Sequence, residues 1–267
     1  MSVRVQRSVL VVLGAILAAF LALPVIALFA TATIADLSSG LQHPLVWPAL
    51  RLSVLTTSIS TAIAVLLGTP LAWILATARG RFFGLLETLL QVPIVIPPAV
   101  AGIALLLAFG RRGLITSALC PDGCSITFTT SAVVLAELFV SAPFFVQAAT
   151  SAFRRVDSQL VLVAQTFGAS PLRVFFRIAV PLAMPGIVAG AAMSWARALG
   201  EFGATLMFAG NLEGRTQTLP LAIYTALETD LRAAQALSIG LVIVALTLLV
   251  FVRATLRGSR ASWEAPP

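Results

Sequence analysis

The sequence predicts an all-α membrane protein with six transmembrane helices, and three observations carry that prediction. Hydrophobic residues make up 59% of the 267 residues. Charged residues make up only 10%, whereas soluble domains carry about 25%. The mean hydropathy is +1.03. A water-soluble domain cannot bury so much apolar surface, so we expect the apolar segments to cross a lipid bilayer.

Six apolar segments are long enough to cross the bilayer, which takes about 20 residues of α-helix. In the third we expect a broken backbone near Pro97-Pro98 and Gly102, which could offer hydrogen-bond donors to an anion. The fourth contains Glu137 and Pro143, and the fifth contains two charged residues and several glycines that should bend or break its helix. The six segments are residues 8–30, 49–75, 83–109, 129–150, 179–209 and 233–252.

The first segment has two interpretations. Arg4 and Arg7 precede it, and Ala30-Thr31-Ala32 at its end resembles a signal-peptide cleavage site. Its apolar stretch is longer than the core of a usual signal peptide, which has about 7–15 residues. The sequence therefore favours a retained helix over a cleaved signal peptide.

The placement of arginines predicts the orientation. With both termini in the cytoplasm, eleven arginines lie on the cytoplasmic side, in agreement with the positive-inside rule. The arginines lie at the ends of apolar segments and not on one amphipathic face, so the net charge of +7 does not indicate a nucleic-acid-binding surface. The five arginines on the outer side are Arg51, Arg111, Arg112, Arg215 and Arg232.

Several kinds of chemistry are excluded by residue types. All 17 basic residues are arginine, so the chain has no Walker A lysine and no Schiff-base lysine. His43 is the only histidine, which argues against a histidine-rich metal site. We expect no catalytic residue, metal or cofactor on this chain. Cys120 and Cys124 flank a turn of an outer loop, where a disulfide and two free thiols are both possible.

A cytoplasmic segment at about residues 156–180 is amphipathic. Val161, Ala164 and Gly168 share a helical face with Gln165. Gly168 and Ser170-Pro171 should then break the helix, and a second short helix over residues 172–178 should end before Pro181. Such a helix–turn–helix can offer a small knob to a protein partner, or it can be a connector that contacts only lipid.

This segment resembles the cytoplasmic loop of ABC-importer permeases, whose pattern is EAA, three residues, Gly, nine residues, Ile, any residue, Leu-Pro. Ala164, Gly168, Ile178 and Pro181 match it, while Leu162, Val163 and Val180 depart from it. The resemblance implies a coupling helix that docks on a separate ATPase subunit, which binds the ATP and Mg. The implied contact residues are Ala164, Gly168, Ala169, Ser170 and Arg173.

The stretch SWARALGEFGATL, residues 194–206, places two charges inside the fifth apolar segment. Arg197 and Glu201 stand four residues apart and can pair on one helix face, which lowers the high cost of a charge in the bilayer. The pair either locks helices together or lines and gates a pathway, and both readings stay open. The predicted pathway or gate residues are Ser194, Arg197, Gly200, Glu201, Gly203 and Thr205.

Two longer stretches, ARALGEFGATLMFAGNLEGRTQTLPLAIYTAL and QVPIVIPPAVAGIALLLAFGRRG, resemble the molybdate-type permeases, a group that includes tungstate and sulfate permeases. The resemblance implies the type I ABC importer permease fold. It also implies a homodimer in the bacterial inner membrane, with a periplasmic oxyanion-binding protein as a partner. Residues 1–47 would hold the first helix and a periplasmic loop, residues 48–253 the permease domain, and residues 254–267 a cytoplasmic tail.

Molybdate is the substrate that the resemblance favours, with tungstate and sulfate or thiosulfate as alternatives. A rival of a different class is a secondary transporter that works without ATP; the coupling-loop pattern argues against it. A membrane enzyme is disfavoured because the acidic residues of the spans, including Glu87 and Glu137, are scattered along the sequence.

Overall fold

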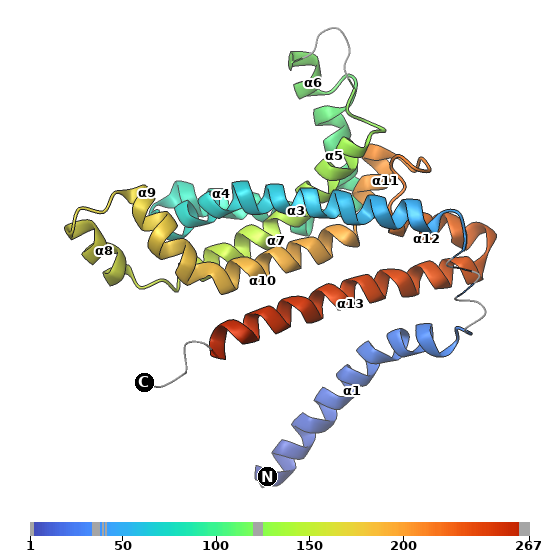
Figure 1. Cartoon of the computed structure of the whole chain (residues 1–267), viewed down its shortest axis with the longest axis horizontal. Coiled ribbons are helices and arrows are strands. Elements are labelled where there is room, and N and C mark those ends of the chain that lie inside the picture. The colour runs from blue at the N-terminus through green and yellow to red at the C-terminus, as the bar shows by residue number, and fades with distance from the viewer. Residues whose placement is uncertain (1–2, 34–37, 39, 41, 120–124, 262–267) are drawn as a thin grey trace.

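A computed structural model describes residues 3–33, 38, 40, 42–119 and 125–261, and its regular structure over these ranges is entirely helical. The long helices α3 (Val46–Thr77), α7 (Thr130–Phe153) and α10 (Val180–Leu199) lie side by side as a central bundle (Figure 1). Helix α13 (Leu231–Ala261) runs along this bundle, and α1 (Val3–Ala30) diverges from it. Cys120 and Cys124, for which a disulfide and two free thiols were both left open, lie outside the described residues.

Six helical segments of the described residues are long and apolar enough to cross a membrane, which confirms the predicted fold class. They are Arg7–Ala30, Val46–Thr77, Pro98–Ala118, Thr130–Phe153, Pro171–Leu199 and Leu231–Val250. Helix α13 continues to Ala261, so residues 254–261 of the predicted cytoplasmic tail are helical and the remainder lies outside the described residues.

The third predicted segment is not one helix. Helix α4 (Arg81–Val95) is followed by its C-cap Ile96. Helix α5 (Pro98–Phe109) begins after Pro97, whose backbone is extended at φ −56° and ψ 141°. Two consecutive prolines supply no backbone N–H and force the preceding residue out of helical geometry, which explains the break. Helix α4 lies along α3, whereas α5 turns away toward α6 (Leu114–Leu119) (Figure 1).

The fifth predicted segment breaks as expected but begins earlier. Helix α10 ends at Leu199 and a new helix, α11 (Gly203–Ala209), starts after Gly200 and Phe202. The prediction of a separate helix over residues 172–178 is wrong. Helix α9 (Pro171–Val174) runs through a π-helical turn (Phe175–Ala179) directly into α10. The wider turn directly precedes Pro181, which cannot donate the hydrogen bond of an α-helical turn.

Small residues let the central helices approach closely. Gly68 of α3 and Gly190 of α10 both face Phe145 of α7, and an ideal Cβ on Gly190 would lie 2.9 Å from the Cβ of Ala148. Phe145 is fully buried at the centre of this core with Ala72 and other small residues. Close contact between helices that expose little more than backbone is a common way to stabilise helix packing in membranes.

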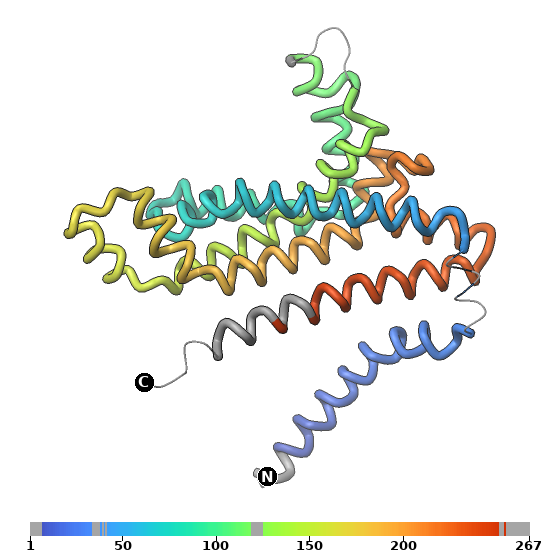
Figure 2. Tube along the Cα trace, viewed as in Figure 1, coloured from blue at the N-terminus to red at the C-terminus, as the bar shows by residue number. Residues whose placement is uncertain are grey.

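Helix α12 (Leu219–Thr229) closes one end of the bundle. Its first backbone N–H, at Leu219, donates to the Oγ of Ser53 at 2.7 Å. Helix α1 contacts the rest of the chain through α13, where the Gln235 side chain donates to the Leu28 carbonyl oxygen. None of the residues in the most apolar part of α1 is buried in the single chain, whereas 56% of the residues in the corresponding part of α7 are buried. The Cα trace in Figure 2 shows the same divergence of α1.

Candidate functional site

Two broken helices meet at one crossing. Helix α5 starts after the break at Pro97, helix α11 starts after the break at Gly200–Phe202, and the two starts pack against each other. An ideal Cβ on Gly203 would lie 2.7 Å from the Cβ of Pro98. One on Gly102 would lie 2.6 Å from the Cβ of Met207. The helices therefore approach this closely only because both positions are glycine. We call this region the broken-helix crossing.

The predicted Arg197–Glu201 pair forms at this crossing. A guanidinium nitrogen of Arg197 lies 2.8 Å from Oε2 of Glu201, whose side chain is only 1% exposed, against 29% for Arg197. The other carboxylate oxygen, Oε1, accepts a hydrogen bond from the backbone N–H of Ala204 at 2.9 Å. Glu201 thus joins the last turn of α10 to the first turn of α11, where a negative charge also favours the helix N-terminus.

These contacts support the reading in which the pair locks two helices together. Arg197 sits in the last turn of α10, where its positive charge interacts favourably with the helix dipole. Gly200 is exposed at the break, and Gly203 is half-buried. A gating role for the pair is compatible with the partial exposure of Arg197 and stays a prediction.

Ser194 and Thr205 flank the pair and are fully buried. Within the described part of the chain, neither side-chain hydroxyl has a hydrogen-bond partner. Both belong to the single-chain interior and not to its surface, so the structure does not place them on a pathway open to solvent. Their predicted pathway role stays a prediction.

A buried acid next to this region was noted in the sequence but not predicted as a site residue. Glu137 of α7 is 2% exposed. Its carboxylate oxygens accept hydrogen bonds from the Thr56 hydroxyl at 2.8 Å and the Ser60 hydroxyl at 3.3 Å. The signal was present in α3, where hydroxyl residues recur at helical spacing on one buried face. These residues are Ser53, Thr56, Thr57, Ser60 and Thr61.

We expect Glu137→Leu to destabilise the folded chain by about 1–3 kcal/mol, because it removes the shared acceptor of two buried hydroxyls. Glu137→Gln keeps an acceptor oxygen of nearly the same shape and should unfold within about 0.5 kcal/mol of the native chain. Thermal unfolding of the detergent-purified variants measures the difference. Equal stability of the leucine and glutamine variants would contradict a hydrogen-bonding role for Glu137.

The predicted cytoplasmic segment has the expected helix–glycine–helix shape. Helix α8 (Ser158–Thr166) is capped by Asp157, whose side chain accepts from the Gln159 N–H at 2.8 Å. Gly168 adopts φ +78°, a left-handed conformation that favours glycine. The Ser170 hydroxyl accepts from the Arg173 N–H at 3.4 Å and caps α9. Residues Asp157–Val174 are named the coupling segment below.

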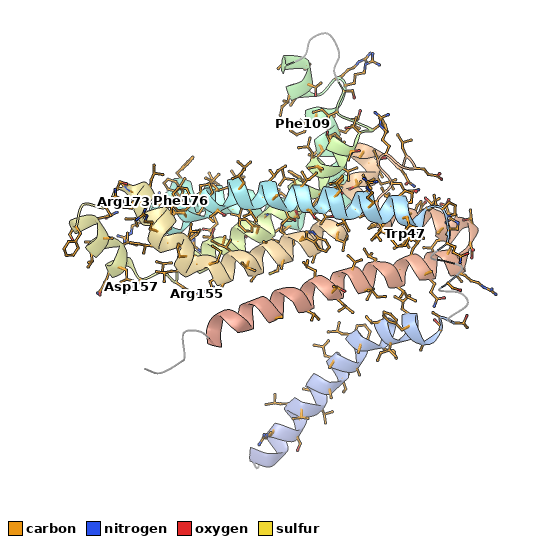
Figure 3. All side chains as sticks on the ribbon, in the orientation of Figure 1. Trp47, Phe109, Arg155, Asp157, Arg173 and Phe176 are labelled. Carbon is orange, nitrogen blue, oxygen red and sulfur yellow. The ribbon has the colours of Figure 1, made fainter. Side chains whose placement is uncertain are left out.

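The broken-helix crossing and the coupling segment lie toward opposite ends of the bundle. Asp157, Arg173 and Phe176 are labelled at the α8–α9 end in Figure 3. Trp47 and Phe109 are labelled far from them, on the side of the bundle where α11 and α12 lie.

The coupling segment exposes apolar side chains that the sequence did not single out. Phe167, at the turn between α8 and α9, is 88% exposed. Leu162 and Leu172 on either side of it are 63% and 70% exposed. Large apolar side chains that stay exposed outside a membrane span are typical of an interaction site. They alternate in sequence with the predicted contact residues Ala164, Gly168, Ala169, Ser170 and Arg173, whose role no contact in the single chain tests.

No group of three or more histidine, cysteine, aspartate or glutamate side chains suited to holding a metal ion occurs among the described residues.

Residues 68–260 match the family described as "Binding-protein-dependent transport system inner membrane component". The chain belongs to this family. The match includes the coupling segment and the broken-helix crossing, so both regions are part of the shared permease unit.

Two relatives are similar to this chain over most of their length. The chain is 46% identical over 235 residues to the molybdenum transport system permease protein ModB of Mycobacterium tuberculosis, covering 88% of this chain and 89% of that protein. It is 37% identical over 243 residues to the molybdate/tungstate transport system permease protein WtpB of Pyrococcus abyssi, covering 90% and 92%.

A solved structure supports the permease fold independently of sequence. The chain superposes with a TM-score of 0.74 and 16% identity on a chain from the crystal structure of a bacterial alginate ABC transporter in complex with an alginate pentasaccharide-bound periplasmic protein. The likeness covers 93% of this chain and 94% of that one. At this identity it shows the fold alone, which is that of ABC importer permeases.

Proposed function

We propose that this chain is the membrane-spanning subunit of an ATP-driven importer for tetrahedral oxyanions, with molybdate as the preferred ion. The observation that carries the proposal is the 46% identity to a molybdenum permease over 88% of the chain. The similarity to a molybdate/tungstate permease points to the same class of ion. Tungstate is the nearest alternative substrate, and sulfate or thiosulfate is the next.

The energy source in this proposal is a separate ATPase subunit. The chain has no lysine for a Walker A site, so ATP and Mg bind on the partner. The exposed apolar surface around Phe167 supports docking of that partner on the coupling segment. Burial of this surface favours association, and the capped helices α8 and α9 hold it in a fixed shape. Closure of the ATPase then moves the coupling segment.

The pathway in this proposal runs past the broken-helix crossing in a homodimer. A divalent oxyanion that leaves water needs hydrogen-bond donors. The start of α5 offers the N–H groups of Ala99 and Val100, which have no partner within an α-helix that begins at Pro98. Arg197 compensates the charge of Glu201, which would otherwise repel the anion. Interrupted helices next to a transported ion are common in transporters.

The placement in the cell follows from the same proposal. The chain lies in a bacterial inner membrane with both termini in the cytoplasm, as the distribution of arginines favours. A periplasmic binding protein delivers the ion to the outer face. A secondary transporter would need neither partner.

The ATPase activity of the assembled complex tests this function. We expect the chain, purified with its ATPase and reconstituted in lipid, to support ATP hydrolysis that rises severalfold when the molybdate-loaded binding protein is added. A binding protein without molybdate is the control. A rate of ATP hydrolysis that does not change when the loaded binding protein is added would contradict the proposed importer.

A further inference from the structure

Helix α4 is held loosely against the bundle. It lies alongside α3 and α7, yet none of its residues from Arg81 to Val95 is buried. An apolar groove of about 460 Å³ runs between its residues Leu89, Leu90 and Pro93 and helices α3, α5 and α7. Helix α4 packs against the core only through the partly buried Leu86 and Leu90, so it can shift without exposing a fully buried residue of its own.

Besides the short connection from α3 and the packing of Leu86 and Leu90, two attachments link α4 to the candidate sites. At its C-terminal end, the break at Ile96–Pro97 leads directly into α5 and the broken-helix crossing. Near the middle of the helix, a guanidinium nitrogen of Arg154 donates a hydrogen bond to Oε2 of Glu87 at 2.8 Å, and the two side chains form an ion pair. Arg154 is the C-cap of α7, and α8 of the coupling segment begins four residues later at Ser158. This ion pair therefore joins α4 to the root of the coupling segment.

The Glu87–Arg154 pair lies outside the six candidate membrane spans of the described residues and is partly exposed at the surface of the single chain. The side chains are 29% and 48% exposed, respectively. An exposed ion pair contributes little to folding stability, so it can break and reform at small cost. The pair is thus poorly suited to holding the fold together and well suited to a contact that changes during a working cycle.

We propose that α4 is a releasable strap. In this state, the Glu87–Arg154 ion pair fastens α4 to the root of the coupling segment. Movement of the coupling segment breaks the pair, α4 shifts over the apolar groove, and the start of α5 moves at the broken-helix crossing. The inference rests on the proposed function, since the partner ATPase supplies the movement.

Charge reversal tests the strap in proteoliposomes that hold the complete complex. We expect Glu87→Arg and Arg154→Glu each to lower the molybdate transported per ATP hydrolysed by about fivefold or more, with little change in thermal unfolding. The double variant restores the pair with its charges exchanged and should recover at least about half of the native ratio. Arg81→Glu, an exposed residue of the same helix, is the matched control and should transport normally.

A reversible cross-link tests the release step separately. Cysteines are placed at Glu87 and Arg154 in a chain whose Cys120 and Cys124 are replaced by serine, and a short bifunctional methanethiosulfonate joins them. We expect transport to fall at least about tenfold below that of the unlinked cysteine variant and to return to the unlinked level when a reductant cuts the link. Normal transport by the linked protein would overturn the strap.

The outcomes separate this inference from the proposed function. If the native complex shows no ATP-dependent uptake, the proposed function fails before any variant is compared. If the native complex transports and both single reversals transport as well as it does, the strap fails and the importer stands. A double reversal no better than the single ones would also overturn the strap.

Discussion

Phe167→Asp is expected to abolish coupling between this permease and its ATPase. Phe167 is 88% exposed at the tip of the coupling segment, in a single chain that gives it almost no contacts. In the proposed complex it fills an apolar pocket on the ATPase, and a carboxylate there would be desolvated without a partner. We expect uptake of molybdate to fall at least about 100-fold, which corresponds to about 2.7 kcal/mol of lost interaction.

Two further variants make this prediction specific. Phe167→Leu keeps an apolar side chain and should retain uptake within about threefold of the native complex. Gly168→Asp places a side chain where φ is +78° and adds a charge to the same tip, so it should uncouple the complex as well. Measurements of co-purified ATPase and of uptake together report the effect. Normal uptake by Phe167→Asp would place the docking surface elsewhere.

Arg197→Met is expected to destabilise the broken-helix crossing strongly. It leaves the carboxylate of Glu201, which is 1% exposed, without its positive partner. Breaking a buried ion pair costs about 3–5 kcal/mol. Because Arg197 is itself partly exposed, we expect about 3 kcal/mol, measured as a loss of thermal stability in the purified protein.

The double variant Arg197→Met/Glu201→Gln separates locking from gating. Glutamine removes the unpaired charge and can still accept the hydrogen bond from the Ala204 N–H, so most of the stability should return. The proposed pathway next to the crossing predicts that this folded variant still transports at least about tenfold more slowly. Native transport rates in a stable double variant would mean that the pair only locks α10 to α11.

The pattern of apolar segments predicted the architecture well, because helix length in a bilayer is set by hydrocarbon thickness. Six spans were expected, and six candidate spans are found among the residues that the structure describes. The break near Gly200 and the turn at Gly168 were also predicted, because glycine weakens a helix and readily adopts backbone conformations that other residues avoid. The broken backbone at Pro97-Pro98 was predicted too, because two consecutive prolines cannot continue a helix, although apolar composition alone does not distinguish one helix from two.

The parts of the candidate sites that sequence reasoning missed depend on tertiary contacts. Glu137 became a site residue only when α7 was seen to face the hydroxyl side of α3. Phe167 resembled any apolar residue of the chain until its exposure was known. The ion pair between Glu87 and Arg154 joins residues 67 positions apart, a distance over which no local periodicity acts. Arg197 and Glu201, four residues apart, could be paired from spacing alone.

Uptake of labelled molybdate tests the central claim most directly. Proteoliposomes would hold this chain with its ATPase, with the binding protein outside and ATP sealed inside or omitted. We expect uptake only with ATP, inhibited by unlabelled tungstate and little affected by sulfate. Equal inhibition by sulfate would contradict the preference for molybdate, and uptake that continues without ATP would contradict the assignment as an ATP-driven importer.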